Sequence, residues 1–142
     1  MHDRSNSDPK VVQGFGEEWA RFTQRELDTS ERDDIFHDYF SIFPWNELPT
    51  RSIGADIGCG SGRWAAVVAP RVGQLICVDA SADALAVARN NLAGISNVTF
   101  HQTDVGQLPF EDESLDFAYS LGVLHHVPDT GSAIYNIART LK

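Results

Sequence analysis

The chain has 142 residues, 42% of them hydrophobic, and a formal net charge of −9 at pH 7. Length and composition indicate one globular domain that is large enough to bury a core without disulfides or metals. Because an acidic surface repels a phosphate backbone, the charge argues against nucleic acid as a partner.

The N-terminal part predicts a tail followed by helices. Residues 1–10 are polar and include Pro9, so we expect a loose tail there. Within residues 11–27, Trp19 and Phe22 are three positions apart and share one face of a helix. Their side chains either pack against the rest of the protein or form a lid over a ligand.

A second N-terminal helix is predicted after Ser30, which can cap it with Asp33 three residues later. Apolar and aromatic residues then recur at helical spacing between residues 35 and 43. Pro44 ends this pattern, and residues 45–50 form a connection to the first strand.

From residue 51 onward, strands alternate with helices. The predicted strands are residues 52–57, 74–78, 97–101 and 115–120. The predicted helices are residues 63–69, which Pro70 ends, residues 82–92, which Ser81 caps, and a last helix that Asp129 or Thr130 opens and that runs to residue 141. This alternation indicates an α/β protein whose parallel sheet is covered on both faces.

A glycine-rich turn follows the first predicted strand, with Gly58, Gly60 and Gly62 at alternate positions. Glycines let the backbone turn tightly and approach a ligand where a Cβ would collide. The helix that follows offers free N–H groups and the positive end of its dipole. Asp56 adds a carboxylate just before the turn, and together these features predict a nucleotide or nucleoside site.

The other strand ends carry further candidates. Asp79 ends the second strand, where an acidic side chain can accept both ribose hydroxyls, and Asp104 follows the third, where it could accept from an adenine amino group. His125 and His126 follow the fourth. Either aspartate alone could simply cap a helix, but ligands bind beyond the carboxyl ends of such strands, so all these features together indicate a nucleoside site.

These motifs resemble those of class I S-adenosylmethionine-dependent methyltransferases, in the small-molecule branch that includes the enzymes of the ubiquinone and menaquinone pathways. The resemblance covers residues 53–142. The residues that carry it are Asp56-Ile57-Gly58-Cys59-Gly60-Ser61-Gly62, Val78-Asp79, Asp104, the stretch 108–116 from Leu108-Pro109-Phe110 to Asp116, and residues 121–129 with their paired histidines.

The resemblance implies a Rossmann-like, doubly wound parallel sheet with strand order 3-2-1-4. Residues 51–142 would form the N-terminal part of the S-adenosylmethionine-binding domain. The resemblance says little about the N-terminal helices, and the pattern of residues 1–50 itself predicts a tail and a helical lid or cap. Family members normally continue with further strands, so the resemblance implies that C-terminal strands are missing here. The fourth strand would then be an open edge that could pair with another chain.

The resemblance also implies a place for each part of the cofactor, S-adenosyl-L-methionine, which leaves as S-adenosyl-L-homocysteine. The glycine turn would lie against its methionine part, Asp56 near its amino group, and the Leu121 carbonyl near the amino group and the sulfonium. Asp79 would hold the ribose, with Ala80 beside the adenine. The residues expected to bind the cofactor are Asp56, Gly58, Cys59, Gly60, Gly62, Asp79, Ala80, Asp104, Val105 and Leu121.

Methyl transfer is an in-line displacement, so orientation of the acceptor supplies much of the rate. A base is required only if the acceptor loses a proton as it attacks. His126, or else His125, is the candidate because histidine titrates near neutrality, although either side chain could instead pack or cap the next helix. No metal is expected, and the acceptor is expected to be a small molecule.

Two other functions fit parts of the pattern. Gly60-Ser61-Gly62-Arg63-Trp64-Ala65 matches the dinucleotide motif of NAD(P)-dependent oxidoreductases, for which Asp79 would also be suitable. A pyrophosphate would lie poorly beside Asp56, however, whereas three carboxylates suit a sulfonium cation. Alternatively, the chain is a cofactor-binding or interaction module without turnover of its own.

The remaining features favour the cytoplasm. Cys59 and Cys77 have neither zinc-site nor disulfide spacing and are expected to be reduced thiols. No apolar run reaches membrane-spanning length, and the polar first ten residues lack the apolar core of a signal peptide.

Overall fold

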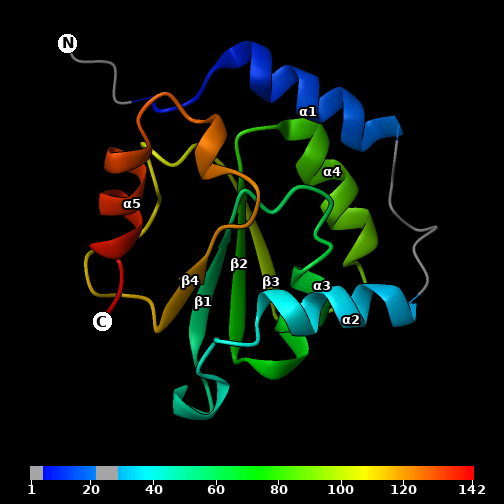
Figure 1. Ribbon diagram of the computed structural model, residues 1–142, viewed down its shortest axis with the longest axis vertical. Coiled ribbons are helices and arrows are strands. Elements are labelled where there is room, and N and C mark those ends of the chain that lie inside the picture. Colours follow the sequence, from blue (N-terminus) through cyan, green and yellow to red (C-terminus); the bar gives the residue numbers. More distant parts are fainter. Residues whose placement is uncertain (1–4, 22–28) are drawn as a thin grey trace.

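The computed structural model describes residues 5–21 and 29–142 (Figure 1). Its centre is a four-stranded parallel sheet in the order β3-β2-β1-β4, which confirms the predicted α/β class and strand order. The strands are β1 (Ile53–Ile57), β2 (Gln74–Asp79), β3 (Val98–Gln102) and β4 (Phe117–Tyr119). The helices are α1 (Pro9–Arg21), α2 (Thr29–Tyr39), α3 (Ala65–Val68), α4 (Ala82–Asn91) and α5 (Thr130–Ala138), with 3₁₀ turns at Trp45–Glu47, Ala69–Arg71 and Leu124–His126.

Both faces of the sheet are covered, as Figure 1 shows. Successive strand residues point to opposite faces, so Leu75 and Cys77 join the cluster beneath α2, α3 and α4, whereas Val78 joins the cluster that includes Ala133 of α5. Helices on both faces explain why β1 and β2 are almost continuously apolar.

Aromatic side chains attach α2 and the turn after it to the first of these clusters. Phe36 and Phe40 are buried and stack on each other, with ring centroids 4.4 Å apart. Phe40 also meets the edge of Tyr119 on β4, at 5.2 Å. The second N-terminal helix is therefore part of the core that supports the sheet.

Helix α1 passes over the end of the sheet and lies on α4 (Figure 1). The two helices approach closely because Gly16 has no side chain: a Cβ there would lie 2.6 Å from Oγ of Ser81. This packing holds α1 above the carboxyl ends of the strands.

Several predicted boundaries are corrected. Ser30 lies inside α2, which begins at Thr29, and so does not cap it. Helix α3 has only four residues, because Pro70 occupies a 3₁₀ turn that follows at once. The other two caps are confirmed: Ser81 Oγ accepts from Ala84 N–H at 3.2 Å, and Asp129 accepts from Ser132 N–H at 2.9 Å.

Strand β4 is an edge of the sheet formed by the described residues, but the segment that enters it has backbone hydrogen-bond partners. Just before it, Leu115 pairs in parallel with Leu141. Leu115 N–H donates to the carbonyl of Thr140 at 2.8 Å, and Lys142 N–H donates to that of Leu115 at 3.0 Å. The chain after α5 thus runs alongside the segment that enters β4.

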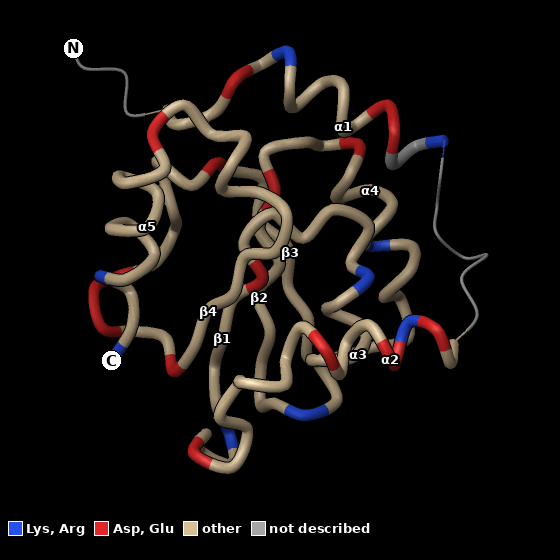
Figure 2. The backbone as a smooth tube through the Cα atoms, viewed as in Figure 1, with Lys and Arg blue, Asp and Glu red and all other residues tan. Residues whose placement is uncertain are grey.

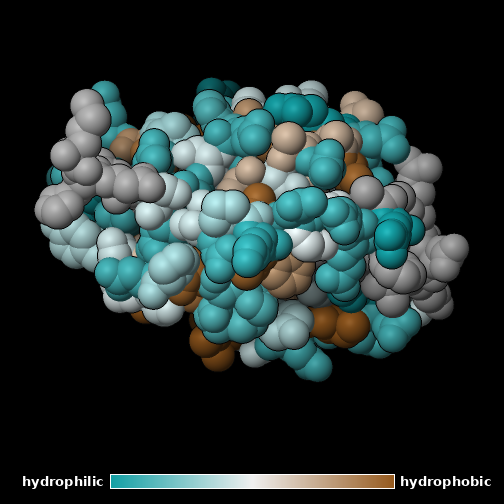
Figure 3. Space-filling model, turned by 90° about the horizontal axis from the view of Figure 1, so that it is seen from above, coloured by the Kyte–Doolittle hydropathy of each residue, from teal (hydrophilic) through white to brown (hydrophobic). Residues whose placement is uncertain are grey.

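Acidic positions are spread over α1, α2 and the loop beside α5, and basic positions are few and scattered (Figure 2). From above, over α1, the surface is mostly hydrophilic, with hydrophobic residues in small separate groups (Figure 3). None of the described helices is long and apolar enough to cross a membrane.

Candidate functional site

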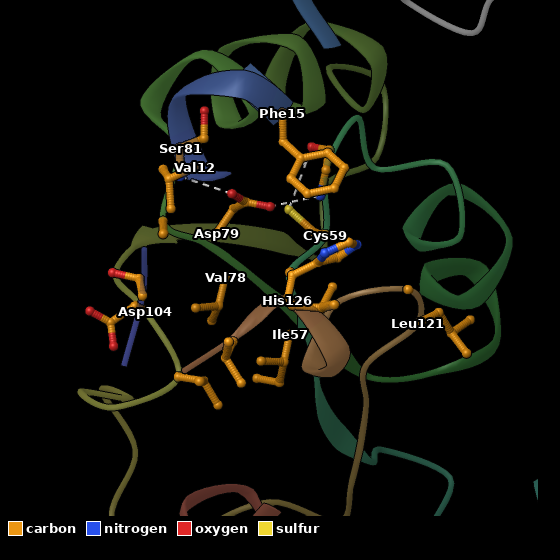
Figure 4. Close-up of a pocket in the computed structure, with 18 of the residues that line it drawn as sticks. Val12, Phe15, Ile57, Cys59, Val78, Asp79, Ser81, Asp104, Leu121 and His126 are labelled. Carbon is orange, nitrogen blue, oxygen red and sulfur yellow. Dashed lines mark hydrogen bonds between the residues drawn. The ribbon is translucent and has the colours of Figure 1, made fainter. Parts of the chain in front are cut away.

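A cavity of about 480 Å³ opens where the strands end beneath α1 (Figure 4). This volume is within the range of sites for small molecules and cofactors. It is lined by nine of the eleven residues that the sequence predicts for the site, namely Gly58, Cys59, Gly60, Asp79, Ala80, Asp104, Val105, Leu121 and His126. Asp56 and Gly62 are the two that do not line it.

The glycine loop, residues 58–62, follows β1 and forms the floor of the cavity beside β2. Gly58 and Gly62 have φ of +76° and +77°, in the left-handed region that disfavours side chains. A Cβ on Gly58 would also lie 2.4 Å from Val123, which lines the cavity after β4. Gly58 is therefore required for both the turn and the contact between two strand ends.

Asp79 fixes the loop to the next strand. Its two carboxylate oxygens accept from Gly60 N–H and from Ser81 N–H, each at 2.9 Å (Figure 4). Burial raises the pKa of Asp79, and these backbone donors lower it in part. The carboxylate is thus held in one orientation at the cavity surface, with lone pairs left over for hydroxyl donors of a ligand.

Asp104 lies on the far side of the cavity from Leu121 (Figure 4). Its Oδ1 accepts from Gly106 N–H at 2.6 Å and from Asn6 N–H at 3.0 Å, and its Oδ2 accepts from the Ser5 hydroxyl at 3.1 Å. Residues 5–8, which we name the N-terminal strap, therefore cross this end of the cavity. The prediction of a loose tail is wrong for these residues.

Asn6 holds the strap in place. It is buried, its side-chain amide donates to the Asp129 carbonyl at 2.7 Å, and its side-chain oxygen accepts from Asp129 N–H at 2.9 Å. Together with the bond to Asp104, one residue connects the segment after β3 to the start of α5. The predicted pair Trp19 and Phe22 lies outside the described side chains, and Phe15 of α1 faces the cavity instead.

Asp56 lies beneath the glycine loop, on the face of β1 opposite to Ile57, and its Oδ2 accepts from the Tyr119 hydroxyl at 3.0 Å. Complete burial raises its pKa to about 7, opposed by the Tyr119 hydrogen bond and reinforced by the charge of Asp79. Burial likewise raises the pKa of Tyr119 well above its usual value. The predicted contact of Asp56 with the cofactor amino group stays a prediction.

Cys59 and Cys77 are free and buried next to this pair. Their mutual contact, together with burial, raises the pKa of the Cys59 thiol well above its usual value. A thiol that stays protonated is a poor nucleophile, so Cys59 lines the cavity as a small apolar group.

His126 extends into the cavity from the turn after β4 (Figure 4). Phe15 meets its ring edge-on, with centroids 4.9 Å apart, and the ring of His125 lies 3.8 Å away. The side chain is exposed and forms no ion pair with a carboxylate among the described residues. No group of three or more described His, Cys, Asp or Glu residues could hold a metal ion.

Apart from the N-terminal strap and α1, other residues that the sequence interpretation did not assign to the site also line the cavity, and two pairs of them are important for its chemistry. Ile35 and Tyr39 of α2 reach the cavity, and Arg63 and Trp64 enter it directly after the glycine loop. The signal for the last two was their place in the motif, where a charged and an aromatic residue follow Gly62. No local signal marks Ile35 or Tyr39, because only the packing of α2 brings them here.

A family profile described as a methyltransferase domain matches residues 55–142, which is more than half of the chain. The chain therefore belongs to the methyltransferase domain family, as the motifs at its strand ends indicated.

Two curated relatives illustrate the match. YcgJ of Bacillus subtilis, described as an uncharacterized methyltransferase, is 37% identical over 89 residues, which are 61% of this chain and 35% of YcgJ. Demethylmenaquinone methyltransferase of Staphylococcus aureus is 33% identical over 90 residues, 61% of this chain and 37% of the enzyme. The matched stretch is thus little more than a third of either relative.

Solved structures share the fold. The crystal structure of YcgJ superposes with a TM-score of 0.68 at 32% identity, over 75% of this chain and 46% of YcgJ. Phosphoethanolamine N-methyltransferase 1 of Haemonchus contortus reaches 0.73 at 18% identity, over all of this chain and 32% of that enzyme. The [4+2]-cyclase SpnF reaches 0.75 at 22% identity, over 97% of this chain and 58% of SpnF, so the fold also occurs in a protein named for another reaction.

Proposed function

We propose that the cavity binds S-adenosyl-L-methionine and that the chain takes part in methyl transfer to a small-molecule acceptor. The observation that carries this proposal is the meeting of the glycine loop, Asp79 and Asp104 around one cavity of about 480 Å³. Membership of the methyltransferase domain family supports it. With a cavity rim that is mainly acidic, a sulfonium ligand is favoured over a pyrophosphate.

The residues present fit this cofactor. Because Gly58 has no Cβ, the glycine loop can pack against Val123. This packing leaves the backbone of the loop accessible to a ligand in the cavity. Asp79 presents an oriented carboxylate at the cavity surface, which we expect to accept from the ribose hydroxyls. Asp104 and Val105 line the same cavity, and we expect the adenine ring beside them. Ala80 would flank the ring, and the glycine loop with Leu121 would surround the methionine part.

The cofactor supplies an activated methyl group on a sulfonium sulfur, so the chain's task is to bind, orient and exclude water. Phe15 on α1 and the N-terminal strap cover the cavity, which supports a lid or cap role for residues 1–50. His126 beside Phe15 is the residue we propose to accept a proton from an acceptor that loses one. An acceptor without a proton to lose makes His126 dispensable.

Calorimetry with S-adenosyl-L-homocysteine and with NAD, side by side, tests the cofactor. We expect binding of the first and none of the second. Binding of NAD alone would sink the proposal in favour of an oxidoreductase. A screen of small-molecule acceptors, with S-adenosyl-L-homocysteine release as the readout, then tests turnover and separates an enzyme from a binding module.

Two minor proposals accompany this one. Cys59 and Cys77 as free thiols support a reducing compartment, and we place the protein in the cytoplasm. We also propose that the outer edge of β4 pairs with a further strand or chain, because an open edge presents unpaired backbone groups. Sedimentation velocity of the purified chain tests the second point: a monomer at all concentrations would exclude pairing between copies.

A further inference from the structure

The charges around the cavity are unevenly distributed. Asp8, Asp79 and Asp104 contribute carboxylates, whereas Arg63 is the one Lys or Arg among the described residues that line it. Arg63 forms none of the ion pairs found among the described residues. A ligand with an anionic group therefore meets one fixed positive charge in this cavity.

Arg63 carries a buried donor that the described residues leave unpaired. Its guanidinium carbon lies 4.5 Å from the centre of the Trp64 ring, and its Nε is buried without a hydrogen-bond partner among those residues. Leaving a buried hydrogen-bond donor without a partner costs free energy. A ligand oxygen that accepts from the Arg63 side chain after a small rotation of that side chain would remove this cost. The guanidinium fork matches a carboxylate in a way that the point charge of lysine does not.

Helix α2 supports the arrangement. Tyr39 meets the Trp64 ring edge-on at 5.6 Å, and Phe36 lies 6.3 Å from it. Trp64 in turn provides the flat surface on which the guanidinium lies. The aromatic residues of α2 thus limit where Arg63 can place its charge.

We propose that Arg63 binds the α-carboxylate of S-adenosyl-L-methionine, with Trp64 as the positioning residue beneath it. This inference rests on the proposed function and assigns the anionic end of that ligand. Asp79 and Asp104 repel a carboxylate from the ribose and adenine end, so the two ends of the ligand are distinguished by charge. The competing use of Arg63, an anionic group on the methyl acceptor, is an outcome of the test below.

The test compares two ligands that differ only in the carboxylate: S-adenosyl-L-methionine and its decarboxylated form, which keeps the sulfonium and the amine. Binding is measured by calorimetry for the wild-type chain, Arg63→Gln and Arg63→Lys. We expect Arg63→Gln to weaken S-adenosyl-L-methionine by about 10- to 100-fold, as for hydrogen bonds to charged groups, and the decarboxylated ligand by less than about 3-fold. Arg63→Lys should lie between.

Arg89→Gln is the matched control. Arg89 lies over the Phe100 ring at 5.4 Å and outside the cavity lining, so it makes the same charge change and loses a similar ring contact. It should leave both affinities unchanged. If Arg63→Gln weakens the binding of both ligands equally, Arg63 has a structural role. If it weakens the binding of neither ligand, Arg63 is left to bind an anionic group of the methyl acceptor. Either result overturns this inference but leaves the proposed function intact. If the wild-type chain binds neither ligand, the proposed function fails, and this inference with it.

Discussion

The glycine loop and the N-terminal strap border the same cavity but are held by different kinds of contact. The loop is joined to β2 mainly through the backbone, because Gly58 N–H and Cys59 N–H both donate to the carbonyl of Val78, at 2.7 and 3.0 Å. The Asp79 carboxylate adds one side-chain contact by accepting from Gly60 N–H. The strap depends on side chains: the Asn6 amide bonds Asp129, 123 positions away, and the Ser5 hydroxyl bonds Asp104.

This difference predicts different responses to perturbation. Because the loop continues β1 and pairs with β2, it cannot open without disturbing the sheet. We expect the strap to separate from Asp104 and Asp129 while the sheet stays intact, because its hydrogen bonds to them involve no strand residue. Changes in the loop should therefore reduce global stability and ligand binding together, and changes in the strap should act mainly on the cavity opening.

Gly58→Ala should destabilise the chain by roughly 2–5 kcal/mol, since it adds a left-handed backbone cost to overpacking against Val123. The measurement is the free energy of unfolding in urea. Gly122→Ala is the control, because Gly122 has a similar φ of +73° but nothing within 4 Å of a Cβ. If both variants lose the same stability, the contact with Val123 carries no weight.

Asp56 should make stability depend on pH. Its pKa is about 7 in the folded chain, against 3.8 for an ordinary aspartate, so the folded state keeps a proton that the unfolded state has released. Stability should therefore fall as pH rises from 5 to 7 and then level off, a loss of about 2–3 kcal/mol. The raised pKa of Asp79 acts in the same direction.

Asp56→Asn keeps an oxygen that accepts from the Tyr119 hydroxyl but removes the titration. Urea unfolding at pH 5, 6, 7 and 8 should show a flatter profile for this variant than for the wild type, with the larger difference at pH 8. Identical profiles would mean that Asp56 titrates normally, and would leave Asp79 to account for the slope.

Asp79→Ala should weaken S-adenosyl-L-homocysteine binding by roughly 1.5–3 kcal/mol, the range for hydrogen bonds to charged groups. The loss combines the ribose contact with the release of Gly60 N–H and Ser81 N–H. Asp83→Ala, an exposed change on the first turn of α4, is the control for charge. An unchanged affinity in Asp79→Ala would show that the ribose lies elsewhere.

Asn6→Ala should cost about 1 kcal/mol, because it removes the side-chain bonds to Asp129. The informative readout is hydrogen exchange: the strap should exchange faster while β1 and β2 stay protected. Gln13→Ala, an exposed change on α1, should leave the strap unaffected. Faster exchange throughout the sheet would contradict the idea that the strap opens independently.

The parts of the site that sequence predicted are those that local rules determine. A strand followed by an aspartate fixes where Asp79 and Asp104 lie, and the caps Ser81 and Asp129 act within three residues of themselves. The period of two along a strand also predicts that Asp56 and Ile57 face opposite sides of the sheet. Only the structure shows that Ile57 is the one that lines the cavity.

The strap was not predictable in this way. Nothing around Asn6 in the sequence marks it, because its partners are brought together only when β3, β4 and α5 are assembled. The same holds for Tyr39, whose contact with Trp64 depends on how Phe36 and Phe40 seat α2 on the sheet. The sequence motifs therefore predicted the glycine loop at the floor of the cavity. The segments that cover the cavity, α1 and the N-terminal strap, depend on tertiary packing.

Trp64 gives the cavity a fluorophore of its own. Its indole lines the cavity and contacts both the Arg63 guanidinium and the Tyr39 ring, so a ligand that moves Arg63 changes the surroundings of the indole directly. With Trp19 and Trp45 replaced by phenylalanine, the emission of a single tryptophan follows ligand entry in real time. Stopped-flow traces of that emission then give the rate at which the ligand enters the cavity beneath α1 and the N-terminal strap.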